Sequence, residues 1–356
     1  MHLKKRLYYW ANLKYGFSST LNTIYAYKLN KNKSYRPKRE QFNGTNGGIF
    51  SVDWFLPDSD TDSSPIIVVC HGINGGSNEP VVQKFCLRIN REKKWKAAVV
   101  LYRGCCGTML STLQTYHGGF TEDLHIALKE ISIRYPNAPI GLAGFSMGGN
   151  NIAKYLGERD SKIRPTKIYQ HLEQNDPIPQ NVKCAANLCC PFDFLYIDKH
   201  ISKKQHMIAG AGMDKFVQKH SYMLSRTPQF DLYNAQNDKS SSTIDHMLTI
   251  HFFKYDSRDE FYRESSAVHY LDGVKLPMIF IQTKNDQVSD YGAFARKEIE
   301  ENQNISAFIL PGGAHLGLFP LMSTRRTFEE DIFIQFFENF LIINEGADLN
   351  NKAKFF

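Results

Sequence analysis

Short apolar runs recur along most of this chain, and each ends in glycine or in polar residues. Runs of this length are too short for helices and are typical of buried parallel strands. They occupy residues 64–72, 96–104, 139–145, 182–192, 276–286 and 306–315, and two further strands are expected at 39–42 and 47–57. Amphipathic helices are predicted at 81–94, at 120–135 and directly after 146. Strands that alternate with helices predict an α/β fold, with a mostly parallel twisted sheet and helices on both faces.

One long stretch, residues 191–276, interrupts this alternation. It is rich in Lys, His, Tyr, Phe and Met and contains no clear strand. Long insertions in compact domains usually carry function, and ligands of open α/β sheets bind at the carboxyl ends of the strands. We therefore expect a helical cap over that edge. At 356 residues with 42% hydrophobic side chains, the chain needs only one such domain, which we place at residues 41–356.

The charge is concentrated in a basic, aromatic N-terminal arm, residues 1–40. The arm has ten Lys or Arg against one acidic residue, a balance of +9, whereas the whole chain carries +7. Its interleaved Tyr, Trp and Phe suit the headgroup region of an anionic membrane. An arm that packs on the domain and keeps its lysine heads in water explains the same pattern equally well. No recognisable nucleic-acid module accompanies the charge, so no nucleic-acid partner is expected.

The seven cysteines follow neither a disulfide framework nor a zinc-ligand spacing, which favours a reducing compartment and no metal or other cofactor. The chain has no run of 18 apolar residues, and its first residues lack the pattern of a signal peptide. We expect a cytoplasmic protein that is not secreted and that associates with a membrane, if at all, peripherally.

The candidate nucleophile is Ser146, in the sequence GFSMG at residues 144–148. A GxSxG sequence between a strand and a helix is typical of a nucleophile elbow, a sharp turn that only small neighbours tolerate. The turn exposes Oγ at a helix N-terminus, where backbone N–H groups favour developing negative charge. The apolar run before it and the amphipathic helix after it both match this context.

A serine needs a histidine to take its proton and an acid to orient that histidine. Asp286 and His315 each follow one of the last apolar runs, so both are expected at the carboxyl edge of the sheet, in the chain order serine, aspartate, histidine. Asp193, after an earlier run, is a rival for the acid. An aspartate after a strand is also often a helix cap or a turn residue.

Two backbone N–H groups are expected to stabilise the oxyanion that forms when Oγ attacks a carbonyl. One belongs to Met147, directly after the nucleophile. The other is expected in the loop HGINGG at residues 71–76, where Ile73 is the candidate. His71, in the same loop, is expected to have a structural role.

These motifs resemble those of a known family. HGINGG at 71–76, GFSMGGNNIAKYLGE at 144–158, TKNDQV at 283–288 and GGAHLG at 312–317 are similar in order and spacing to the ABHD1/ABHD2/ABHD3 type of α/β hydrolase, to which the YheT-like hydrolases are related. The resemblance implies an α/β-hydrolase fold and hydrolysis of carboxylic esters, such as acylglycerols, phospholipids or medium-chain fatty-acid esters. It also implies that Ser146, Asp286 and His315 match the catalytic triad of the family.

The prediction is therefore a serine esterase or lipase that acts on apolar fatty-acid esters through an acyl-enzyme on Ser146. Two alternatives stay open: acyl transfer to an alcohol, and a noncatalytic ligand-binding protein on a hydrolase scaffold. The pattern HxxxxD, which is associated with acyl transfer, occurs from His171 to Asp176 in a polar stretch.

Overall fold

The protein is built on one eight-stranded sheet with the strand order β1-β2-β4-β3-β5-β6-β7-β8. The computed structural model describes residues 35–167, 169–202, 205–207, 210, 212–226, 249–313, 315–318 and 327–342. The strands are β1 (Lys38–Asn43), β2 (Ile49–Phe55), β3 (Ile66–Cys70), β4 (Lys96–Leu101), β5 (Ile140–Phe145), β6 (Val182–Leu188), β7 (Met278–Thr283) and β8 (Ile305–Leu310). β1 and β2 pair antiparallel to their neighbours, and the other six strands run parallel. The predicted α/β fold with a mostly parallel sheet is confirmed.

The strand order reverses direction between β3 and β5. From β3 the chain adds β4 on one side, then crosses over to add β5 on the other. Loops that leave two such neighbouring strands diverge, and the crevice between them is where open α/β sheets bind ligands. The loop at residues 71–76 leaves β3 and Ser146 follows β5, so the topology brings both to this crevice.

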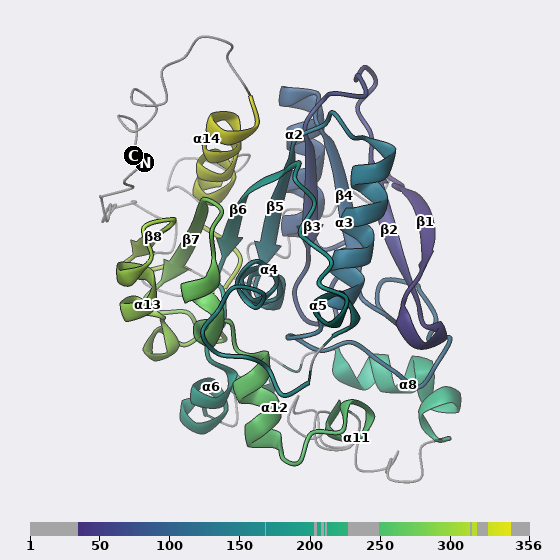
Figure 1. Cartoon of the computed structure of the whole chain (residues 1–356), viewed down its shortest axis with the longest axis vertical. Helices are drawn as coiled ribbons and strands as arrows, with labels where there is room; N and C mark the ends of the chain where they lie inside the picture. The colour runs from purple at the N-terminus through teal and green to yellow at the C-terminus, as the bar shows by residue number, and fades with distance from the viewer. Residues whose placement is uncertain are drawn as a thin grey trace.

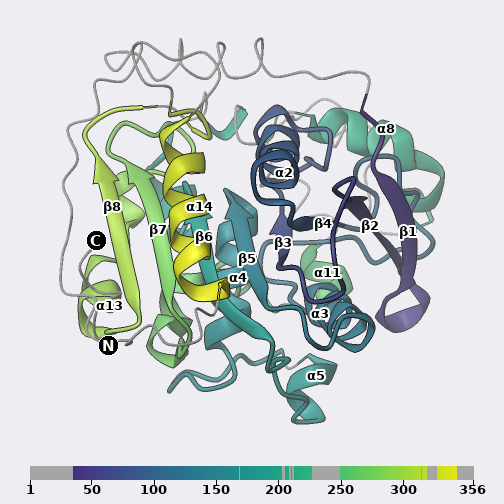
Figure 2. The same ribbon diagram turned by 90° about the horizontal axis from the view of Figure 1, so that it is seen from above.

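Helices cover both faces of the sheet (Figures 1 and 2). Apolar side chains of α2 (Pro80–Lys93) and α14 (Phe328–Leu341) share one buried cluster with Ile67 and Val69 of β3. Those of α3 (Glu122–Arg134), α4 (Met147–Gly157) and α13 (Arg296–Glu301) share the opposite cluster with Ile66 and Val68. Successive side chains of a strand point to opposite faces, so the continuous apolar runs of the sequence are explained by burial on both sides.

The first part of the segment between β6 and β7 lies beyond the carboxyl ends of the strands (Figure 1), whereas residues 267–273 pack against α4. The described elements of this segment are α6 (Phe194–His200), α8 (Met213–Leu224), α11 (Ile250–Phe253), α12 (Arg258–Ser265) and η3 (Ala267–Gly273). Among the described residues of 191–276 no strand occurs. The described part of the predicted cap is helical, and its status as a separate unit remains a prediction. The remaining short elements are α5 (Gln170–Glu173), η1 (Thr45–Gly47) and η4 (Tyr291–Ala293).

The predicted N-terminal arm lies almost wholly outside the described residues. Its last part belongs to the sheet, because β1 begins at Lys38 and the Tyr35 ring stacks on Phe55 with centroids 5.0 Å apart. The prediction of membrane contact through the arm is therefore untested. In the described part of the chain, no helix combines the length and apolarity that crossing a bilayer requires.

Candidate active site

Ser146 forms a sharp elbow between β5 and α4. Its backbone has φ 55° and ψ −122°, a strained combination for a residue with a side chain. The Ser146 N–H donates to the Leu188 carbonyl of β6 over 2.8 Å, which holds the turn in place. The side chain is nearly buried, at 5% exposure, so Oγ faces the interior of the cap region and not bulk solvent.

The glycines of the motif are required by close backbone contacts. A Cβ at Gly148 would lie 2.1 Å from the carbonyl oxygen of Cys70 at the end of β3. One at Gly144 would lie 2.5 Å from Oδ1 of Asn187 in β6. Any side chain at either position would push α4 away from the sheet, so the glycines let the elbow sit against both neighbouring strands.

His315 joins Ser146 to Asp286 through both of its ring nitrogens. The Ser146 hydroxyl lies 2.9 Å from Nε2, and Nδ1 lies 2.9 Å from Oδ2 and 3.0 Å from Oδ1 of Asp286. The side chain of Asp286 is fully buried, whereas that of His315 is 15% exposed. The structure thus brings together the three residues that the sequence singled out, although they lie on three different loops.

Asp286 is anchored by the backbone of its own loop, which follows β7. Its Oδ1 accepts the N–H groups of Val288 and Ser289 at 2.8 and 2.9 Å. These two hydrogen bonds from backbone amides fix the orientation of the carboxylate. The acid is therefore oriented before any substrate arrives.

Asp193, the rival for the acid, and His71 both have structural roles. Asp193 caps α6, because its carboxylate accepts the N–H of Tyr196 at 2.9 Å. His71 is fully buried, donates from Nδ1 to the Gly72 carbonyl at 2.7 Å and accepts the Tyr102 N–H at Nε2. Burial lowers the pKa of His71 to about 4, so it stays neutral and supports the loop.

The predicted oxyanion donors lie beside Ser146. Met147 is the first residue of α4, so its N–H has no acceptor within the helix. Ile73 lines the same pocket as Ser146 and Met147. The next two amides of its loop are already bonded, from Asn74 to the Tyr116 hydroxyl and from Gly75 to the Gly72 carbonyl.

Glu79 supports this loop and was not found from the sequence. It precedes α2, and its carboxylate packs so closely on the loop that a Cβ at Gly75 would meet it. Burial raises the pKa of Glu79 to about 7, while the amides of Gly76 and Gly72 and the charge of His315 oppose the rise. Its position depends on how the loop folds back on the helix, which no local pattern encodes.

Cys189 is a second residue that the sequence did not point to. It follows β6 directly, and its thiol lies within hydrogen-bonding reach of the Asp286 carboxylate and the Leu316 backbone. Burial, reinforced by the Asp286 charge, raises the pKa of the Cys189 thiol well above its usual value. It touches Asp286 because β6 and β7 are neighbours in the sheet, and strand order is not readable from the apolar pattern.

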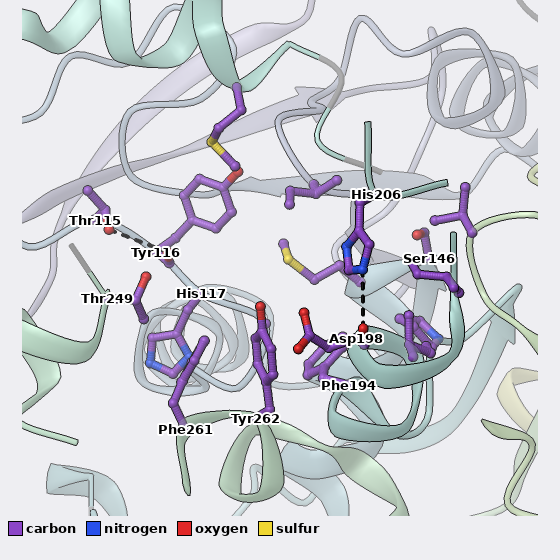
Figure 3. Close-up of a pocket in the computed structure, with 18 of the residues that line it drawn as sticks. Thr115, Tyr116, His117, Ser146, Phe194, Asp198, His206, Thr249, Phe261 and Tyr262 are labelled. Carbon is purple, nitrogen blue, oxygen red and sulfur yellow. Dashed lines mark hydrogen bonds between the residues drawn. The ribbon is translucent and has the colours of Figure 1, made fainter. Parts of the chain in front are cut away.

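An apolar pocket extends from Ser146 under the cap helices. In Figure 3, Ser146 lies at one end and Tyr116, His117 and Phe261 at the other. Cap residues form much of the wall: Phe194, Ile197, Asp198, Ile201, His206, Met213, Phe216, Thr249, Phe261 and Tyr262. Most of these side chains are apolar or aromatic, which is typical of a site that binds an apolar ligand with a few polar groups for orientation.

The HxxxxD pattern lies in a different place. His171 is buried near the C-terminal end of α4. Its Nδ1 lies 2.8 Å from Glu122 and its Nε2 lies 3.3 Å from Glu158. Lys154 also pairs with Glu158. Asp176 contacts Lys129 and His125 instead. Neither residue of the pattern is among those that line the pocket at Ser146. We call the buried cluster of Lys154, Glu158, His171 and Glu122 the ionic cluster.

Thr121 also contacts the ionic cluster. It precedes α3, and its hydroxyl donates to Glu158 and makes no cap hydrogen bond to the helix. The hydroxyl thus adds a hydrogen bond to a buried carboxylate that His171 and Lys154 also contact.

Several curated proteins of similar sequence are named as hydrolases. No protein-family model matches the chain. It is 26% identical over 337 residues to monoacylglycerol lipase of Saccharomyces cerevisiae, an alignment that covers 90% of this chain and 70% of the relative. It is 25% identical to human phospholipase ABHD3 over 319 residues, covering 88% of this chain and 74% of the relative.

Solved structures agree on the fold. The esterase Pf2001 of Pyrococcus furiosus superposes with a TM-score of 0.53 at 14% identity, covering 87% of this chain and 94% of the esterase. At that identity the likeness shows the architecture alone. The chain therefore has the α/β-hydrolase fold, and its sequence relatives are hydrolases of the ABHD type.

Proposed function

We propose that this protein is a serine esterase or lipase that hydrolyses carboxylic esters of fatty acids through an acyl-enzyme on Ser146. The observation that carries the proposal is the chain of hydrogen bonds from Asp286 through His315 to Ser146, at the end of an apolar pocket. The chain is a hydrolase that acts on ester bonds, in keeping with relatives named lipase and phospholipase. The acyl-enzyme, the roles of the residues and the substrate are the proposed part.

In the acylation step, Ser146 Oγ attacks the ester carbonyl while its proton passes to Nε2 of His315, 2.9 Å away. Asp286 holds the Nδ1–H and stabilises the imidazolium that forms. The negative charge that develops on the carbonyl oxygen is met by the N–H groups of Met147 and Ile73, together with the N-terminal end of α4.

His315 then gives the proton to the leaving alcohol, which departs. Water enters, loses a proton to His315 and attacks the acyl carbonyl, and the fatty acid is released with Ser146 restored. Because the same imidazole acts first as base and then as acid, its position between Ser146 and Asp286 supports both halves of the cycle.

The pocket supports an acyl chain as the group that is bound. Phe194, Phe261 and Met213 are apolar wall residues, and burying an apolar chain against them is favourable by roughly 0.8 kcal/mol per methylene. His117, at the far end, is a neutral polar group, because burial lowers its pKa well below the usual value. We infer an acylglycerol or a medium-chain ester, in line with the relative named monoacylglycerol lipase.

Turnover of p-nitrophenyl esters of increasing acyl length tests the proposal. Wild type is expected to hydrolyse them, and Ser146→Ala is expected to lose turnover while it keeps its fold by circular dichroism. Equal turnover in both proteins would overturn the acyl-enzyme on Ser146, and the absence of turnover in wild type with every ester would favour a noncatalytic ligand-binding role.

The same assay separates hydrolysis from acyl transfer. With ethanol added, free acid as the product supports hydrolysis, and ethyl ester as the main product supports transfer to an alcohol. The position of His171 in the ionic cluster, outside the pocket lining, gives the HxxxxD pattern no part in either reaction.

We also propose that the arm at residues 1–40 contacts anionic membrane surfaces peripherally, which would bring the pocket close to apolar esters. The arm has the charge and the aromatic residues for such contact. Sedimentation of the full chain with phosphatidylserine vesicles, but not with phosphatidylcholine vesicles, is the expected result. Reversal of Lys4, Lys5 and Arg6 to glutamate should weaken it, and unchanged sedimentation of that variant would contradict the proposal.

A further inference from the structure

Three side chains at the active site place possible metal-ligand atoms close together. A thiol sulfur of Cys189, a carboxylate oxygen of Asp286 and a ring nitrogen of His315 all lie within 4.8 Å of one another. They come from the ends of three successive strands of the sheet, β6, β7 and β8. The catalytic mechanism uses Asp286 and His315 but has no chemical step for Cys189.

The backbone holds Cys189 firmly in this position. Its φ is 52°, in the left-handed region that residues with side chains rarely adopt. Its N–H donates to the Ile281 carbonyl of β7 at 2.8 Å, and its carbonyl accepts the Ser289 hydroxyl at 2.7 Å. Ser289 belongs to the loop that also holds Asp286, so the thiol and the carboxylate are fixed on one frame.

We propose that Cys189, Asp286 and His315 form an inhibitory site for a thiophilic divalent cation such as Zn²⁺. Thiolate sulfur, imidazole nitrogen and carboxylate oxygen are the three protein ligands that Zn²⁺ prefers. One thiolate and one carboxylate neutralise the two charges of the ion, so the buried site carries no net charge. Ligand atoms up to 4.8 Å apart need to move by only about 1 Å to surround an ion at bond lengths of 2.0–2.3 Å.

Binding would remove the general base from the reaction. The ion displaces the proton of the Cys189 thiol, which leaves to solvent, and binds His315 through Nδ1 in place of the hydrogen bond to Asp286. The neutral imidazole then carries its proton on Nε2, the atom that must accept the Ser146 proton. No bond is oxidised or reduced, so removal of the ion restores the enzyme.

The His315 imidazole is the part of the proposed site through which the cation would enter. The His315 side chain is 15% exposed, whereas the Asp286 side chain and Cys189 are fully buried. In this proposal the ion reaches Asp286 and Cys189 when the His315 ring rotates away from Asp286. The inhibition rests on the proposed function, while binding of the ion does not.

Binding is tested without catalysis on Ser146→Ala, with Cd²⁺ as the probe. A thiolate–Cd²⁺ charge-transfer absorption at one equivalent is expected. It should persist when Cys106→Ala is added and disappear when Cys189→Ser is added. Cys106 is the matched control because it is the one thiol of the seven that is not buried, and serine at 189 keeps a donor of similar size beside Asp286. A band that survives Cys189→Ser, or no band at all, would overturn the proposal.

Inhibition is tested on the active enzyme with p-nitrophenyl esters and Zn²⁺. Wild type and Cys106→Ala should be inhibited at the same concentration and recover with EDTA. For Cys189→Ser the half-inhibitory concentration, relative to its own metal-free rate, should rise by at least about 10-fold, because one of three ligands is gone. Equal inhibition of all three proteins would overturn the proposal. Metal-free turnover that persists in Ser146→Ala would instead contradict the proposed function, and the Cd²⁺ band would be unaffected by that outcome.

Discussion

Two histidines near opposite ends of α4 each contact carboxylates, and they differ in what the second ring nitrogen contacts. His315 has a carboxylate on Nδ1 and the Ser146 hydroxyl on Nε2, beside a pocket. Each ring nitrogen of His171 contacts a glutamate carboxylate, and the residue lies near the C-terminal end of the helix, at 4% exposure. Burial lowers the pKa of His171, but hydrogen bonds to Glu122 and Glu158 outweigh this and raise it to about 9. His171 is therefore a fixed cation, whereas His315 has a partner that can give up a proton.

The same contrast holds for two glutamates. Burial raises the pKa of both Glu79 and Glu158, but Lys154 and His171 overcome it at Glu158, where the net pKa is lowered. At Glu79 the opposing amides and the His315 charge are weaker, and the pKa rises to about 7. A buried acid is thus charged where it has full cationic partners and close to neutral where it lacks them.

The largest difference should appear on replacing the two histidines by glutamine. His315→Gln removes the proton acceptor of Ser146, and kcat/KM should fall by at least about 10⁴-fold. His171→Gln should leave kcat/KM per folded molecule within about twofold. Turnover of a short p-nitrophenyl ester, corrected for the folded fraction, measures both values. A comparable loss in His171→Gln would break the distinction between the two sites.

Stability should show the reverse order. His171→Gln leaves Glu122 and Glu158 without their shared cation and should cost about 3 kcal/mol of unfolding free energy at pH 6. A raised pKa means that His171 stabilises the fold fully below its unfolded value of 6.5 and loses this contribution as pH rises through about 9. Urea unfolding at pH 6 and pH 9.5 should therefore show a smaller deficit at the higher pH. A deficit that grows with pH would contradict a cationic His171.

The smallest expected effect separates the two glutamates. Because Glu79 has a raised pKa, it stabilises the fold below about pH 4.5 and loses this contribution as pH rises through about 7. As pH rises from 5 to 8, the unfolding free energy of Glu79→Gln should thus increase by about 1 kcal/mol relative to that of wild type. Glu158→Gln should lose stability at pH 8, and its deficit should shrink in acid, because the lowered pKa of Glu158 gives the opposite sign. Urea unfolding from pH 8 down to below pH 4.5 measures both, because the contribution of Glu158 is lost only as pH falls through its lowered pKa. The same sign in both variants would show that their surroundings do not differ.

The sequence predicted those features that depend on local geometry. The elbow at Ser146 follows from two glycines between a short apolar run and an amphipathic helix, and β5 and α4 lie where expected. Asp286 and His315 were found because each follows an apolar run, and parallel strands end at one edge. Their catalytic roles stay predictions that the geometry supports.

Contacts across the sheet were not predictable in this way. Cys189 contacts Asp286 because β6 lies beside β7, and His171 contacts Glu158 because α5 lies next to α3 and the C-terminal end of α4. The order of strands and the packing of distant helices depend on the whole fold, while periodicity describes only one segment at a time. The sequence therefore located the reacting groups and missed the residues that support them.

The account depends most on Ser146 as the nucleophile, and a fluorophosphonate probe tests this directly. Intact-mass measurement of wild type should show one adduct, and peptide mapping should locate it on Ser146. Ser146→Ala should show none, whereas His171→Gln should be labelled like wild type. Equal labelling of Ser146→Ala, or an unlabelled wild type, would contradict the acyl-enzyme.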